Sequence, residues 1–132
     1  MGITLAEVDA GVRGAIAAYT QALDDGRTDD VIATFTPDGA CDIPGLGEHA
    51  GHDALRAAYE RVEPRRPQRH LVLNTLVTEW SEHEARTTSD VVFLLLTHDG
   101  WSVQLVGRYD DVLVRGDDGT WRFRRRVAQF LS

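Results

Sequence analysis

One histidine of this chain occupies a position where its side chain could take part in chemistry. His70 opens an apolar segment that is typical of a β-strand, and Asn74 follows four residues later. Because side chains alternate between the two faces of a strand, His70, Val72 and Asn74 are expected to face the same way. An imidazole and an amide on one wall of a core indicate a small pocket with a polar end. Such a pocket is either a catalytic site or a ligand-binding cup.

Composition argues against several classes of function. The 132 residues suffice for one domain with its own core, and the net charge of −7 argues against nucleic-acid binding, which needs a basic surface. All 14 basic residues are arginine, so the chain has no lysine with which to form a Schiff base. Cys41 is the single cysteine, so no intrachain disulfide is expected and a cytoplasmic location is favoured. No segment is apolar enough for a membrane helix, and the start lacks the features of a secretory signal.

Motifs for metals and cofactors are not recognisable in the sequence. The other histidines lie in predicted loops, hairpin tips or a helix start, without the paired spacing of a zinc or iron site: His49, His52, His83 and His98. The glycine-rich motifs that bind nucleotide phosphates are also missing from the sequence. We therefore expect neither a metal nor a cofactor.

The elements that must position His70 follow an α+β pattern, with helices first and strands afterwards. Helical spacing of apolar residues predicts helices over 4–25 and 52–62, and Thr28 is expected to cap a short helix that ends near Phe35. Between these helices, residues 37–39 predict a turn, 40–43 a short strand and 44–51 a glycine-rich loop.

The rest of the chain reads as long strands joined by tight turns. The predicted strands cover residues 69–80, 84–97, 100–115 and 120–131, and two of the turns between them carry an Asp-Gly pair. The pattern predicts a single domain over residues 1–132, in which three N-terminal helices pack on one face of a mainly antiparallel sheet.

Six short motifs occur in order along the chain. They are Tyr19-x4-Asp24, Asp30-Val31-Ile32-Ala33-Thr34-Phe35, Gly51-x-Asp53-Ala54-Leu55, Arg69-His70-x3-Asn74, Gly107-Arg108-Tyr109-Asp110-Asp111 and Gly119-Thr120-Trp121-Arg122-Phe123. Their order and spacing resemble the SnoaL-like branch of the NTF2-like superfamily across essentially the whole chain. The resemblance implies a cone: a curved sheet whose concave side is closed by helices around an apolar pocket, commonly in a homodimer. Ketosteroid isomerases, scytalone and bile-acid dehydratases, polyketide cyclases and epoxide hydrolases belong to this superfamily, as do members with no known catalysis.

The resemblance also assigns roles to three residues. In the dehydratase-like members, a histidine at the position of His70 carries protons, and a tyrosine and an aspartate with the spacing of Tyr19 and Asp24 line the same pocket. Asp24 would then orient the imidazole, and Tyr19 would donate its phenolic proton to a developing oxyanion. Five residues along a helix turn through about 140°, so both side chains reach one pocket only if the helix end abuts it. Otherwise Tyr19 is a core residue and Asp24 a solvated charge.

For two further polar residues, the sequence leaves open whether they belong to the pocket or to another part of the protein. Asp90 interrupts an apolar strand, which is costly unless the carboxylate is paired or hydrated. It is either a second acid–base group in the pocket or a residue of the opposite face that pairs with an arginine. Asn74 either donates its amide to a substrate oxygen or holds loop backbone.

Aromatic residues and one arginine are the remaining candidates for substrate binding. Tyr59 lies on the buried face of the third helix, while Trp101 and Tyr109 share one face of a strand. Strict alternation places Arg126 on the face opposite Phe123, unless a bulge intervenes. The resemblance places an arginine at the position of Arg126, where it either binds an acidic substrate group or lies at a surface or dimer contact.

Three hypotheses follow for the function. The first is a cofactor-independent dehydratase, isomerase or cyclase that acts on an apolar cyclic or polyketide-like molecule through His70 and Asp24. The second is a non-catalytic domain of the same fold that binds a small molecule or supports an assembly. The third is the small subunit of a ring-hydroxylating oxygenase. Only the first requires Tyr19, Asp24 and His70 together.

Overall fold

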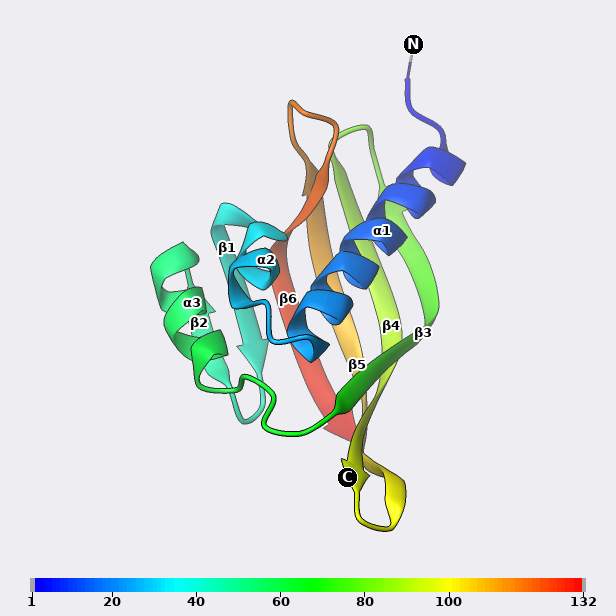
Figure 1. Cartoon of the computed structure of the whole chain (residues 1–132). Helices are drawn as coiled ribbons and strands as arrows, with labels where there is room; N and C mark the ends of the chain where they lie inside the picture. The colour runs from blue at the N-terminus through cyan, green and yellow to red at the C-terminus, as the bar shows by residue number, and fades with distance from the viewer. Residues whose placement is uncertain (1, 132) are drawn as a thin grey trace.

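A computed structural model describes residues 2–131 and shows helices packed on one face of a curved six-stranded sheet (Figure 1). The helices are α1 (Leu5–Asp24), α2 (Thr28–Ala33) and α3 (His52–Glu60). The strands are β1 (Phe35–Ile43), β2 (Gly47–Ala50), β3 (Gln68–Trp80), β4 (Glu84–Thr97), β5 (Gly100–Arg115) and β6 (Trp121–Leu131). The strand order is β2-β1-β6-β5-β4-β3, and every neighbouring pair is antiparallel except β1 with β6. The predicted α+β fold is confirmed. No helix within residues 2–131 is long and apolar enough to cross a membrane.

Helix α1 begins with a complete capping box. The Thr4 hydroxyl accepts the backbone N–H of Glu7 at 3.2 Å, and the Glu7 carboxylate accepts the backbone N–H of Thr4 at 2.9 Å. The helix buries a stripe that includes Val8, Val12 and Tyr19, as the spacing predicted. It ends just before Gly26, whose φ of 72° is readily adopted only by glycine.

The segment between α1 and α3 differs from the prediction in three places. Thr28 does not cap α2, because the helix already begins there and the Thr28 hydroxyl donates to Glu63 at 2.8 Å instead. The predicted turn at residues 37–39 lies inside β1, whose pairing with β6 is irregular between Phe35 and Ala40. The predicted loop 44–51 contains β2, which pairs with β1. The predicted strand 40–43 is the second half of β1. The first half contains Pro37 and Gly39, and β2 has only four residues, so neither shows the alternation by which a strand is recognised.

A β-bulge in β6 reverses the face of its C-terminal half. Phe123 pairs with Leu113 of β5, whereas Arg125 pairs with the next β5 residue, Val112, so Arg124 is the extra residue of the bulge. As a result, Arg126 points inward like Phe123 and is fully buried. The expectation from strict alternation, which placed Arg126 on the face opposite Phe123, is therefore wrong.

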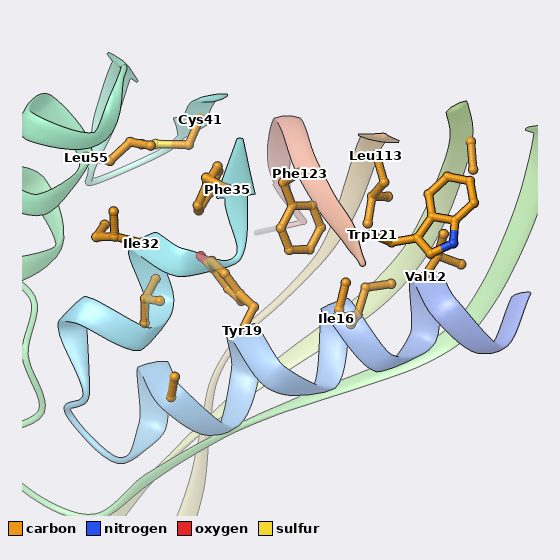
Figure 2. Close-up of a cluster of buried hydrophobic side chains, with 14 of the residues drawn as sticks. Val12, Ile16, Tyr19, Ile32, Phe35, Cys41, Leu55, Leu113, Trp121 and Phe123 are labelled. Carbon is orange, nitrogen blue, oxygen red and sulfur yellow. The ribbon is translucent and has the colours of Figure 1, made fainter. Parts of the chain in front are cut away.

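The core lies between α1 and the sheet (Figure 2). Tyr19 of α1 packs edge-to-face against Phe123 of β6 and Phe35 of β1, with ring centroids 5.6 and 6.1 Å apart. Farther along α1, Gly11 allows the indole of Trp121 to approach the helix backbone. A Cβ at Gly11 would lie 2.3 Å from Trp121 Cδ1, so no other residue fits without movement.

This close approach gives a stability prediction with a control on the same helix. Gly11→Ala is expected to lower the free energy of unfolding by about 1–3 kcal/mol, because the new methyl group overpacks Trp121. Gly14→Ala, where nothing lies within 4 Å, should raise it by roughly 0.5–1 kcal/mol through helix propensity alone. Urea unfolding followed by circular dichroism measures both, and equal effects at the two positions would contradict the packing described here.

Candidate active site

A cavity of about 280 Å³ opens between the helices and the concave face of the sheet. Its wall is mainly apolar, with Leu23 of α1, Phe93 of β4 and Leu105 of β5 among the residues that line it. Polar atoms come from a few side chains only: Tyr19, Tyr59, Gln68, His70 and Tyr109. An apolar cavity with a few convergent polar groups is the usual form of a small-molecule site.

His70 and Asp24 form a hydrogen-bonded pair at this cavity. The imidazole Nδ1 lies 2.6 Å from Asp24 Oδ1, and the backbone N–H of His70 donates to Asp24 Oδ2 at 2.7 Å. Because a carboxylate only accepts hydrogen bonds, this contact places the ring proton on Nδ1 and leaves Nε2 free to take up a proton. The Asp24 side chain is 4% exposed and that of His70 is 17% exposed, so the pair is shielded but the imidazole remains accessible.

The pair is held by the elements on either side of it. Asp24 is the last residue of α1, where a carboxylate opposes the helix dipole, yet it accepts a third hydrogen bond from Gln68 Nε2 at 3.1 Å. The imidazole stacks on Phe93 with ring centroids 4.5 Å apart. The end of α1 therefore abuts β3 at His70: Tyr19 lines the cavity, whereas Asp24 does not line it and is joined to it by its hydrogen bond to His70.

Two buried tyrosines form a second polar group on the cavity wall. The hydroxyls of Tyr19 in α1 and Tyr59 in α3 lie 2.6 Å apart and share a hydrogen bond. Burial is the main cause that raises the pKa of both phenols. Both therefore stay protonated at neutral pH, and the pair keeps one hydroxyl proton that is not used between them and can be donated to a bound oxygen.

Tyr109 lines the cavity with a charged pair behind it. The guanidinium of Arg126 lies over the Tyr109 ring, and its Nε is 3.1 Å from Asp111 Oδ1 in a fully buried ion pair. Burial raises the pKa of Asp111 to about 6, although the positive charge of Arg126 opposes this shift. Arg126 is not among the residues that line the cavity.

Like Asp24 and Arg126, three further candidate residues do not line this cavity. Asp90 is on the opposite face of β4 from Val91 and Phe93, and it accepts hydrogen bonds from Asn74 Nδ2 at 2.7 Å and Arg108 Nη2 at 3.1 Å. Asn74 has a φ of 56° at a register shift between Leu73 and Leu76, which ends its alternation with His70. Trp101 is 51% exposed near the β4–β5 turn. The structure thus favours the surface alternative for Asp90, whereas Asn74 donates to the Asp90 carboxylate and not to loop backbone.

The sequence interpretation missed Gln68 and Phe93, which contact the His70–Asp24 pair. Gln68 precedes His70 by two residues, so strand alternation alone would have placed both on one face. Phe93 pairs directly with His70 across β3 and β4, a register that a single sequence does not reveal. Within residues 2–131, no three His, Cys, Asp or Glu side chains are grouped so that they could hold a metal ion.

The chain matches the family model described as a SnoaL-like domain over residues 5–127. A structure from Catenulispora acidiphila in complex with S-DNPA is 27% identical, with 95% of this chain and 94% of the other covered and a TM-score of 0.84. ActVI-ORFA from Streptomyces coelicolor is 26% identical over 93% of this chain and 96% of the other, with a TM-score of 0.83.

A third structure shows similarity of fold alone. A protein from Novosphingobium aromaticivorans described as a candidate scytalone dehydratase is 24% identical, with coverage of 93% and 83% and a TM-score of 0.81. No curated protein gives a significant match to this chain. Because the family model spans nearly the whole chain, the protein belongs to the SnoaL-like domain family.

Proposed function

We propose that this protein is a cofactor-independent dehydratase, isomerase or cyclase that uses His70 and Asp24 as an acid–base pair. The observation that carries the proposal is the 2.6 Å contact between His70 Nδ1 and Asp24 Oδ1 at the wall of an apolar cavity. A carboxylate that fixes the imidazole tautomer and stabilises the imidazolium is how triads prepare a histidine to act as a base.

The proposed reaction begins with removal of a proton from carbon. His70 Nε2 takes a proton from the carbon next to a carbonyl, and the electron pair of the broken C–H bond moves onto the carbonyl oxygen to give an enolate. The Tyr19–Tyr59 hydroxyl pair donates a hydrogen bond to that oxygen. In dehydration, the enolate collapses to reform the C=O bond, a C=C bond forms, the C–O bond to the β-hydroxyl breaks, and the imidazolium gives its proton to that hydroxyl, which departs as water. In isomerisation, the enolate is conjugated with a neighbouring C=C bond and the imidazolium returns the proton to the far carbon of that system.

The substrate class follows from the cavity. A volume of about 280 Å³ and a mainly apolar wall that includes Leu23, Phe93 and Leu105 favour a compact apolar molecule of one or two rings or an equivalent polyketide segment. Among the similar structures, the Catenulispora acidiphila relative was solved in complex with S-DNPA.

Dehydration of simple ring compounds tests the proposal. Cyclic β-hydroxy ketones of one and two rings are incubated with the protein, and the ultraviolet absorption of the conjugated enone is followed. We expect acceleration over the buffer rate for at least one compound that fits the cavity. If calorimetry shows that such compounds bind and no enone forms with any of them, the non-catalytic binding domain becomes the better assignment.

We also propose that the chain forms a homodimer through the convex face of the sheet. Leu71, Val92, Val106 and Leu131 are paired neighbours in one row across β3, β4, β5 and β6, and three of them, Leu71, Val106 and Leu131, are exposed. An apolar row of this kind on an exposed sheet face is typical of an interaction surface.

The dimer gives a prediction about oligomeric state. Val106→Glu places a charge at the centre of the row and should convert the wild-type dimer into a monomer in light scattering, because burying an unpaired carboxylate is costly. Thr78→Glu, at an exposed site toward the other end of β3, should leave the dimer intact. A monomeric wild-type protein would contradict the proposal.

A further inference from the structure

A fully buried arginine lies directly behind the tyrosine wall of the cavity. The guanidinium carbon of Arg126 is 3.5 Å from the ring centroid of Tyr109 and 4.4 Å from that of Tyr19. Both tyrosines line the cavity, whereas Arg126 is fully buried and is not among the residues that line it. Two of the rings that a ligand would touch thus lie between that ligand and a permanent positive charge.

The charge of Arg126 faces a single carboxylate. Asp111 is its one ion-pair partner among residues 2–131, with Oδ1 3.1 Å from Nε, and none of the three guanidinium nitrogens has a hydrogen-bond partner there. In a buried environment the field of such a charge is much less screened than in water. A cation over the face of a phenol ring also draws electron density from it, which makes the hydroxyl a stronger hydrogen-bond donor.

The Tyr109 hydroxyl is available for such a bond. Within the described residues it makes no hydrogen bond to another side chain, in contrast to the Tyr19 and Tyr59 hydroxyls, which bond to each other at 2.6 Å. The cavity therefore combines an unshared phenolic donor, the free proton of the tyrosine pair and a cation behind both.

We propose that Arg126, acting through Tyr109 and Tyr19, makes this wall of the cavity selective for a conjugated oxyanion, a phenolate or an enolate, over the neutral phenol or ketone. The inference rests on the proposed function, because the enolate is the intermediate assigned there. It adds that the cavity wall prefers the negatively charged form of the ligand. Arg126 is a positioning residue in this role, because it touches the rings and not the ligand.

The test uses 4-nitrophenol, whose phenolate absorbs in the visible, and 4-nitroanisole as a neutral molecule of similar shape. The apparent pKa of the bound 4-nitrophenol is expected to rise by about one unit in Arg126→Met, a tenfold loss of preference for the anion, with 4-nitroanisole affinity within about twofold of wild type. Arg126→Lys should shift it less. Arg125→Met, the same change at the exposed neighbouring residue, should shift it by less than about 0.2 units.

Asp111→Asn supplies a result that a purely structural role does not predict. Removing the counter-charge leaves Arg126 uncompensated, so the bound probe pKa should fall below the wild-type value, opposite in direction to Arg126→Met. Circular dichroism checks that each variant is folded. If Arg126→Met does not fold, the probe pKa values of Asp111→Asn and Arg126→Lys still test the proposal. The proposal would be overturned by a wild-type protein that does not bind 4-nitrophenol or by equal probe pKa values in all folded variants. It would also be overturned if the probe pKa moved in the same direction in the Arg126 variant and in Asp111→Asn.

These measurements are independent of turnover. Loss of activity in a His70 variant together with an unchanged probe pKa in the arginine and aspartate variants contradicts this inference and leaves the proposed function intact. The expected probe shifts together with full activity in a His70 variant contradict the proposed function and leave this inference intact.

Discussion

His70→Gln is expected to lower turnover by about 100- to 10,000-fold while the affinity for a substrate analogue changes less than about threefold. The amide of glutamine has a similar length and is able to hydrogen-bond Asp24, so the cavity keeps its shape. It has no nitrogen that accepts a proton at neutral pH, so the proposed base is lost. The combination of lost turnover and retained binding is what separates a catalytic group from a packing residue.

The matched control for this variant is His83→Gln. His83 lies on an exposed turn between β3 and β4, away from the cavity, so its replacement should leave turnover unchanged within about twofold. Kinetics at saturating substrate and calorimetry with the analogue provide the two readouts. Equal turnover in wild type and His70→Gln would rule out His70 as the base.

Asp24→Asn should cost about 100- to 10,000-fold in turnover by reversing the imidazole tautomer. Asp24 accepts from the backbone N–H of His70, from His70 Nδ1 and from Gln68 Nε2, so all three of its contacts need an acceptor. An asparagine whose oxygen keeps the backbone contact turns its amide donor toward Nδ1. Nδ1 must then accept, the ring proton moves to Nε2, and the atom that has to take up the substrate proton is already occupied.

The tautomer can be measured without a substrate. Two-bond nitrogen–proton NMR correlations of neutral His70 should show the proton on Nδ1 in the wild type and on Nε2 in Asp24→Asn. Asp25→Asn, one residue along and exposed, is the matched control and should preserve both the tautomer and the turnover. A wild-type imidazole that carries its proton on Nε2 would show that Asp24 does not orient it in the way proposed.

The long strands were predictable because alternation and Asp-Gly turns act locally. The observed bounds of β4 and β5, Glu84–Thr97 and Gly100–Arg115, coincide with the predicted ranges. Only residues 40–43 of β1 were predicted as a strand, and β2 was predicted as part of a loop, because the other glycine- and proline-containing stretches are stabilised by pairing with distant parts of the chain, β2 on β1 and β1 on β6. Local sequence carries no signal for such pairing.

Site residues at the ends of helices and strands could be predicted from the sequence. Site residues whose orientation depends on a β-bulge could not. Asp24 and His70 were found through their motifs, and the structure brings them together. Asn74 and Arg126 were assigned to the wrong faces because one extra residue in β3 and one in β6 shift the alternation that follows. A bulge forms where the curvature of the whole sheet requires it, so its position depends on tertiary packing.

The measurement that tests the central claim most directly is the rate of deuterium incorporation from solvent at the carbon next to the carbonyl of a bound cyclic ketone. NMR follows this exchange with wild type and His70→Gln side by side, so that proton abstraction is observed without the later steps. The acid–base account predicts that the wild type accelerates the exchange and that His70→Gln loses at least about 100-fold of this acceleration. Equal exchange rates with the two proteins would contradict it.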